Sequence, residues 1–254
     1  MRMSEAFLLA DASLLQLALV CLVAFAASVL AGISGYGTGL ILPVFVAPLV
    51  GVANVIPVMA VGMLLNNGSR VLAFWRDIQW LHVRRLLAFG LPACAAGAYG
   101  YTLLSGRWIS FILGAFLLAI IPLRRVLNRA RFQFSRAGEH TAGAVFGFIN
   151  GGMTGAGVVL ISILMSAGVE GAALIATDAV VSVVMGLAKV VLFSGLARLD
   201  FGLAAIGLLI GLSTAPGAFV ARWLLKRIPA RIHAWVMELV VAAGAVVLLW
   251  NGVR

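Results

Sequence analysis

Two glycine-rich stretches interrupt a very apolar chain and have the composition of an anion-binding backbone. The first covers residues 32–39, Gly-Ile-Ser-Gly-Tyr-Gly-Thr-Gly, with Pro43 after it, and the second covers residues 151–157. Glycine lets backbone N–H groups approach an anion, and a helix beginning after such a stretch offers a partial positive charge at its N-terminus. Close helix packing through small residues is the alternative explanation. The candidate substrate-binding residues in the two stretches are Gly35, Tyr36, Gly37, Thr38, Gly39, Thr154, Gly155 and Gly157.

Two cations lie within apolar segments, where an ionisable side chain is costly and usually faces a cavity or the inside of a helix bundle. Lys189 stands between Gly-Leu-Ala and Val-Val-Leu-Phe, and Arg70 has Asn66 one helical turn before it. We expect both cations to attract the anion and Asn66 to help bind it. The alternative is that the long side chains extend to the membrane surface, which is easier for Arg70 because Arg76 follows closely.

Asp178 lies eleven residues before Lys189 on the same predicted helix. Eleven residues make three helical turns, so the two side chains share one face, about 16 Å apart along the axis. Asp178 is therefore a candidate to take up a coupling proton or cation. A helix cap or an interhelical hydrogen bond is the alternative role.

The composition is that of an integral membrane protein. The 254 residues are 63% hydrophobic and 10% charged, with a mean hydropathy of +1.15, whereas soluble domains are about half apolar and about a quarter charged. No long polar segment remains for a second domain, so we expect a single transmembrane domain over residues 1–254. Basic loops at the bilayer surface explain the net charge of +10 better than nucleic-acid binding does. No disulfide, metal site or cofactor is predicted, since both cysteines lie in apolar segments.

The apolar segments form two similar halves. Repeat one covers about 14–124, a basic loop 125–139, and repeat two about 140–250. Each half is predicted to be a glycine-broken hairpin followed by three transmembrane helices, which makes the fold an all-α polytopic membrane protein. The matches between the halves include Gly37 and Gly39 with Gly155 and Gly157, and Arg70 with Lys189. The short segments beside the breaks are 39–50, 140–150 and 157–168; the longer ones are 14–31, 53–74, 86–104, 109–123, 171–193, 201–221 and 232–250.

Loop charge gives an orientation. The positive-inside rule places the basic loops after 53–74, 109–123 and 201–221 in the cytoplasm. The two halves are then antiparallel, with both termini outside, which is the inverted-topology repeat of many transporters. The predicted location is the cytoplasmic membrane, with multiple passes. If residues 14–50 formed one broken span instead, the N-terminus would be inside, so whether segment 14–31 crosses fully stays open.

One enzyme motif has to be weighed. Residues 32–35, Gly-Ile-Ser-Gly, resemble the serine motif of rhomboid intramembrane proteases. A serine nucleophile needs a nearby base, but His82, His140 and His233 lie at predicted segment ends, where solvated side chains are expected. We therefore predict no enzymatic activity, with an intramembrane serine protease as an unfavoured alternative.

In these residues the chain resembles the TauE/SafE family of sulfite exporters. The resemblance covers nearly the whole chain and is carried by three features: the glycine cluster and proline at 35–43, the glycine cluster at 151–157, and Ala-Thr-Asp-Ala at 176–179 leading to Lys189. The resemblance implies a secondary carrier in the cytoplasmic membrane for small sulfur-containing anions such as sulfite and sulfonates. The cations and helix N-termini independently indicate a small anion.

The sequence thus predicts alternating-access transport of a small anion at a site near both glycine breaks. An anion channel is the second hypothesis. No ATP-binding loop of the G-x-x-x-x-G-K type is present, so transport is expected to be secondary or to depend on a partner. The particular anion, the direction of transport, the coupling ion and the oligomeric state are left open.

Overall fold

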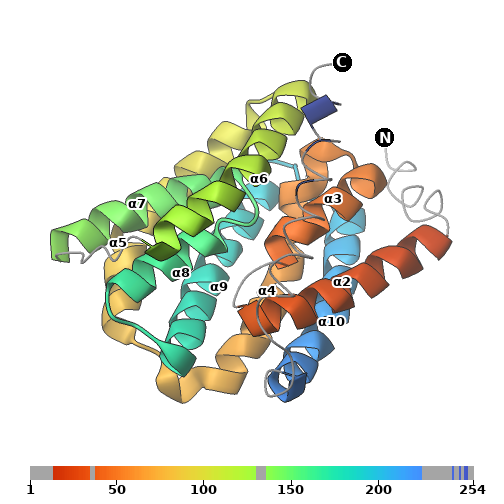
Figure 1. The fold of residues 1–254 in the computed structure, drawn as a ribbon. Helices are drawn as coiled ribbons and strands as arrows, with labels where there is room; N and C mark the ends of the chain where they lie inside the picture. Colours follow the sequence, from red (N-terminus) through yellow and green to blue (C-terminus); the bar gives the residue numbers. More distant parts are fainter. Residues whose placement is uncertain are drawn as a thin grey trace.

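The computed structural model describes residues 14–34, 38–129 and 136–224, together with residues 242, 246, 249 and 250. These residues form nine α-helices and two short 3₁₀ helices, η1 (Val52–Asn54) and η2 (Trp75–Asp77), without a β-strand in the described ranges. An all-helical fold is confirmed (Figure 1). The α-helices are α2 (Leu14–Ser34), α3 (Thr38–Val50), α4 (Val55–Phe74), α5 (Trp80–Thr102), α6 (Gly106–Arg129), α7 (Arg136–Gly152), α8 (Gly157–Ser166), α9 (Gly171–Gly195) and α10 (Phe201–Leu224).

Two of the helices are half-length, as the sequence predicted. Helix α3 has 13 residues and α8 has 10, which is about half of what an upright bilayer span needs.

The predicted length of α7 was wrong. Its 17 residues extend beyond the expected segment 140–150 at both ends, because its first turn is polar and yet helical. In the same way α6 continues to Arg129, so much of the expected loop 125–139 is helical.

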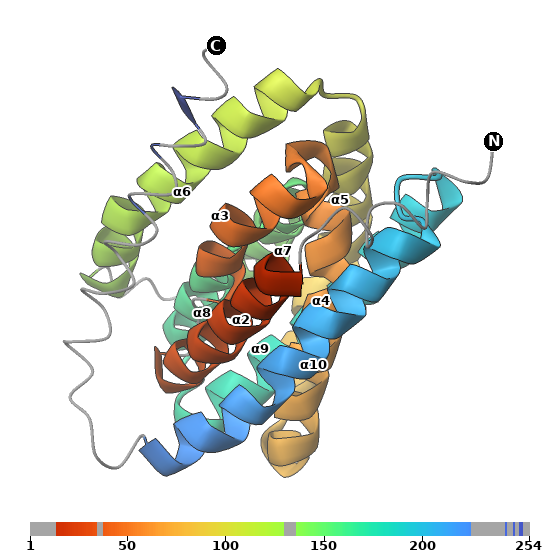
Figure 2. The same cartoon turned by 90° about the vertical axis from the view of Figure 1, so that its right-hand side faces the viewer.

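Three helix pairs organise the bundle. Helix α5 packs along α7, and α2 packs along α10; α4 and α9 pack on each other and connect the two pairs through α4–α10 and α5–α9 contacts. Figure 2 shows α2 and α10 side by side, with the half-helix α3 next to α2. The central position of α4 and α9 is what places their polar side chains inside the protein.

Glycines allow α5 and α7 to pack so closely that their backbones are in contact. Gly90 and Gly97 of α5 and Gly143, Gly147 and Gly151 of α7 lie at this contact, and a Cβ atom added to any of them would meet backbone atoms of the other helix. Small residues every fourth position are the usual means of close helix packing in membranes. Gly151, part of the second glycine-rich stretch, therefore serves helix packing.

The described residues have the helix lengths and the apolar surface that are typical of a membrane protein. Two helical segments, Val52–Asp77 and Gly171–Gly195, are long and apolar enough to cross a bilayer. Large apolar side chains remain exposed on the outside, among them Leu15, Leu72 and Phe201 at 79–86%. Such a surface is stable when lipid rather than water covers it.

Some predictions lie outside the described residues. They concern Gly35, Tyr36 and Gly37 in the first glycine-rich stretch, residues 130–135 of the basic loop, and most of the last apolar segment, 232–250.

Candidate substrate-binding site

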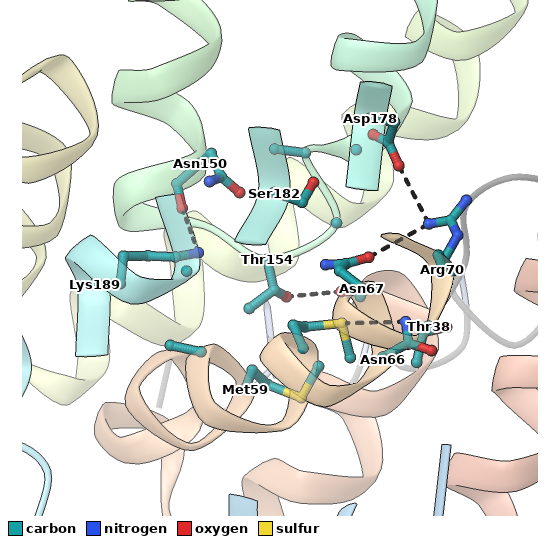
Figure 3. Close-up of a pocket in the computed structure, with 17 residues that line it drawn as sticks. Thr38, Met59, Asn66, Asn67, Arg70, Asn150, Thr154, Asp178, Ser182 and Lys189 are labelled. Atoms are coloured by element: carbon teal, nitrogen blue, oxygen red, sulfur yellow. Dashed lines mark hydrogen bonds and ion pairs between the residues drawn. The ribbon is translucent and has the colours of Figure 1, made fainter. Parts of the chain in front are cut away.

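A cavity of about 90 Å³ lies between α4, α9 and the ends of both glycine breaks. It has room for several water molecules or one small anion. Figure 3 shows polar side chains from α4, α9 and the breaks gathered around it. The predicted site residues that the structure describes all line it: Thr38, Gly39, Asn66, Arg70, Thr154, Gly155, Gly157, Asp178 and Lys189.

The two glycine breaks touch each other at this cavity. The Thr154 hydroxyl donates to the Gly39 carbonyl oxygen at 2.8 Å, and a Cβ atom added to Gly39 would lie 2.9 Å from the Gly155 backbone nitrogen. Helix α3 begins at Thr38 and α8 begins at Gly157, so two helix N-termini lie beside the same cavity. Each offers backbone N–H groups without intrahelical partners.

Gly155 is required by the backbone at this crossing. Its φ is +80°, a left-handed conformation that side chains disfavour, and an added Cβ would meet Leu40 of α3. We expect Gly155→Ala to lower the free energy of unfolding by about 1–3 kcal/mol, measured as a lower melting temperature in detergent. Gly157→Ala is the matched control, because a Cβ at Gly157 meets nothing within 4 Å. Equal melting temperatures for the two variants would contradict the expectation.

Lys189 is a buried cation without a carboxylate partner among the described residues. Its exposed fraction is 8%, and its Nζ donates one hydrogen bond, 3.1 Å long, to the Asn150 carbonyl oxygen. An ammonium has three N–H donors, and taking it out of water is costly unless it is paired. The side chain therefore presents a positive charge and further donors to the cavity.

Arg70 differs from the expectation of two equivalent cations. Its Nη1 atom lies 3.2 Å from Asp178 Oδ2, in an ion pair between α4 and α9, and also donates to Asn67 Oδ1 at 3.4 Å. The carboxylate neutralises much of the Arg70 charge. Asp178, expected to be either a coupling group or an interhelical contact, makes that contact and lines the cavity as well.

Two polar atoms at the cavity are buried without a hydrogen-bond partner among the described residues, Thr38 Oγ1 and Asp178 Oδ1. Buried polar atoms are nearly always paired in a native protein, by protein or by a bound molecule. Thr38 is 2% exposed and stands at the first position of α3. Its hydroxyl is thus placed to bind a molecule in the cavity.

Other residues of the cavity wall were not selected from the sequence. Asn150 was missed because it precedes the second glycine break directly and contributes its backbone carbonyl, which no side-chain pattern reveals. Asn67 and Ser182 are recognisable in the sequence as polar residues one turn from Arg70 and Asp178, but they were not chosen as candidates. The added lining residues are Met59, Ala60, Met63, Asn67, Asn150, Ala156, Ser182 and Gly186.

One protein-family model matches most of the chain. The family described as Sulfite exporter TauE/SafE matches residues 20–248, which include both breaks and both cations. The chain belongs to the TauE/SafE family. A search of curated proteins and a search of solved structures both found no match.

Membership of the TauE/SafE family confirms the resemblance seen in the sequence and makes this an exporter-type anion transporter in a membrane. It also fits the prediction that the protein is not an enzyme. The described histidines have structural contacts in place of the expected solvated positions. His82 Nδ1 lies 3.1 Å from buried Glu139, which also pairs with Arg85, and His140 contacts the Arg85 carbonyl oxygen. Within the described ranges no group of His, Cys, Asp and Glu has a metal-binding arrangement.

Proposed function

We propose that the protein is a secondary carrier that moves small sulfur-containing anions, such as sulfite or short sulfonates, across the cytoplasmic membrane by alternating access at this cavity. The observation that carries the proposal is Lys189, a buried ammonium with one backbone acceptor at the wall of a small cavity. An anion there would supply the missing counter-charge. The substrate class comes from the family, whose description is that of a sulfite exporter.

The cavity wall offers the complementary donors. Beside Lys189, the N-terminus of α8 at Gly157 and the N-terminus of α3 at Thr38 direct positive helix ends at the cavity. Thr154 fixes the crossing of the two breaks. An oxyanion of sulfur has several oxygens around one centre and so accepts hydrogen bonds from several sides at once.

The packing of the helices supports inverted repeats. Helices α2 to α5 and α7 to α10 follow the same order of hairpin arm, half-helix and two long helices. The first arm of each half packs on the last of these helices in the other half, α2 on α10 and α7 on α5, while α4 and α9 pack on each other. This pattern stays the same when the halves are exchanged, as a two-fold relation requires. We infer that the pair formed by α5 and α7 rocks against the pair formed by α2 and α10 around the cavity.

Asp178 is proposed as the coupling residue. It lines the cavity, is 3% exposed and has one unpaired oxygen. A proton or a cation bound there would be carried with the conformational change. With Arg70 and Lys189 cationic and Asp178 anionic, the cavity has one excess positive charge, which suits a monoanion.

Flux measurements on proteoliposomes test the transport mechanism. A carrier is expected to show saturable sulfite uptake that is driven by a proton or cation gradient and shows counterflow. Flux that rises linearly with concentration and follows only the membrane potential would favour the channel. Ser34→Ala should leave uptake intact, since the proposal gives this serine no chemical role.

Thr38→Val tests the hydroxyl at the start of α3. The hydroxyl has no partner among the described residues, so its loss should not lower the melting temperature. A hydrogen bond to a charged group contributes about 1.5–3 kcal/mol, so the dissociation constant for sulfite should rise about tenfold or more. Unchanged affinity in a binding titration would remove Thr38 from the site.

A further inference from the structure

The contact between α4 and α9 fixes how these two helices are aligned at the cavity. The guanidinium of Arg70 on α4 lies 3.2 Å from Asp178 Oδ2 on α9. Further along α9, a Cβ atom added to Gly186 would lie 3.0 Å from Leu64 Cδ2 and 3.9 Å from the Ala60 carbonyl oxygen. Residue numbers therefore rise along α9 where they fall along α4, and the two helices pack antiparallel.

The antiparallel alignment places Met59 of α4 opposite Lys189 of α9. Lys189 lies eleven residues after Asp178, and Met59 lies eleven residues before Arg70. Eleven residues make three helical turns, so each step returns to the same face of its helix. Met59 and Lys189 both line the cavity, and both lie to the left of the Arg70–Asp178 pair in Figure 3. The position opposite Lys189 thus has a methionine where the position opposite Arg70 has a carboxylate.

The two positions are also matched between the halves of the chain. Arg70 matches Lys189, and the same offset relates Met59 to Asp178. Among the described residues of the cavity wall, Asp178 is the one with a carboxylate. Of the two matched cations, one is therefore paired with an acid of the protein. The other, Lys189, has the Asn150 carbonyl oxygen as its acceptor in the described part of the chain.

The surroundings of Lys189 leave its charge to be neutralised by a ligand. Met59 is 1% exposed and Lys189 is 8% exposed, so water solvates this end of the cavity poorly. A buried charge is costly without a partner, and a methionine thioether is uncharged and a weak acceptor. Cys94 of α5, whose thiol interacts with the charge of Lys189, is fully buried and does not line the cavity.

We propose that Met59 is the specificity-determining residue that makes Lys189 a site for an external anion. The bound anion takes the place beside the ammonium that a carboxylate of the protein takes beside Arg70. Met59 lines this place from α4 without a charge, whereas an acidic residue at this position would neutralise Lys189 within the protein. The proposal rests on the transport function above and deepens it, because it names the α4 residue that faces the bound anion.

The test supplies the missing carboxylate. Met59→Glu and Met59→Gln have side chains of nearly the size of methionine and differ from each other by one charge. Isothermal titration calorimetry in nanodiscs with methanesulfonate, which is anionic throughout the neutral and alkaline range, measures the dissociation constants. The value for Met59→Gln should stay within about tenfold of the wild type. The value for Met59→Glu should be at least about 100-fold higher than for Met59→Gln, because a like charge then lies beside the anion.

Thermal unfolding separates an ion pair with Lys189 from damage to the fold. Without ligand, Met59→Glu is expected to melt at or above the temperature of Met59→Gln, since the new carboxylate has Lys189 as its partner. In a Lys189→Met background the order should reverse, because the same carboxylate is then buried unpaired. Excess methanesulfonate should raise the melting temperature of the wild type and of Met59→Gln, but not that of Met59→Glu.

Two results would overturn the proposal. One is equal dissociation constants for Met59→Glu and Met59→Gln, which would show that the anion does not bind beside Met59. The other is a Met59→Glu variant that melts equally far below Met59→Gln with and without Lys189. In both cases the transport function stands if the wild type binds methanesulfonate and Lys189→Met weakens that binding. A wild type that neither binds methanesulfonate nor transports sulfite would contradict both proposals.

Discussion

Lys189→Met is expected to weaken anion binding strongly, and with it transport, without destabilising the protein. The ammonium is 8% exposed and donates to one described acceptor, the Asn150 carbonyl oxygen. Removing one member of a buried charged pair, here Lys189 with its anion, costs about 2–5 kcal/mol. The dissociation constant for methanesulfonate should therefore rise about 30-fold to several thousand-fold, as isothermal titration calorimetry would measure.

The effect on stability separates a binding role from a structural one. Replacing a buried charge by an apolar side chain of similar size is often neutral or stabilising, whereas a cation that supports the fold is lost at a cost. Lys189→Met should thus melt at the wild-type temperature or above it. Lys189→Arg keeps the charge and should retain part of the binding. A lower melting temperature together with unchanged affinity in Lys189→Met would show that Lys189 only holds α9 in place.

The location of the candidate site could be predicted from local sequence signals. Glycines within apolar runs identified both breaks, because clustered glycines are a strong signal for the interruption of a helix. A lysine in the middle of α9 is costly in a membrane and therefore indicated an internal site. Because these signals depend on few neighbouring residues, they can be recognised in the sequence without knowledge of the fold. The meeting of Gly39 with Thr154 and Gly155 gives them a common position.

The ion pair between Arg70 and Asp178 could not be predicted from the sequence. Arg70 and Asp178 are separated by 108 residues, and their contact depends on the way α4 and α9 cross. The sequence placed Asp178 three turns from Lys189 but contained no distance to Arg70. The length of α7 was missed for a different reason: its first turn includes Arg136 and Glu139, and a search for apolar runs does not detect a polar turn that continues a helix.

Gly147→Ala is expected to destabilise the protein more than other single methyl additions in the described helices. Gly147 lies in the middle of α7, and an added Cβ would meet the Gly90 carbonyl oxygen and lie 2.7 Å and 2.8 Å from its carbonyl carbon and Cα. These are backbone atoms of α5, which no rotamer change can move. Overpacking a core costs about 1–3 kcal/mol; at a backbone contact we expect the upper end, measured by thermal unfolding in detergent.

The sign of the effect makes the test specific. Glycine to alanine in a helix normally stabilises by about 1 kcal/mol, so destabilisation at Gly147 must come from packing. Gly100→Ala on α5 is the matched control, because nothing lies within 4 Å of a Cβ there, and this variant should melt at or above the wild-type temperature. If Gly147→Ala had the same melting temperature as Gly100→Ala, α5 and α7 could move apart at little cost in free energy. If α7 is instead fixed to α5, the alternating access that we propose requires the second break to move together with α5. The opening of the cavity is then left to α4, α9 and the first break.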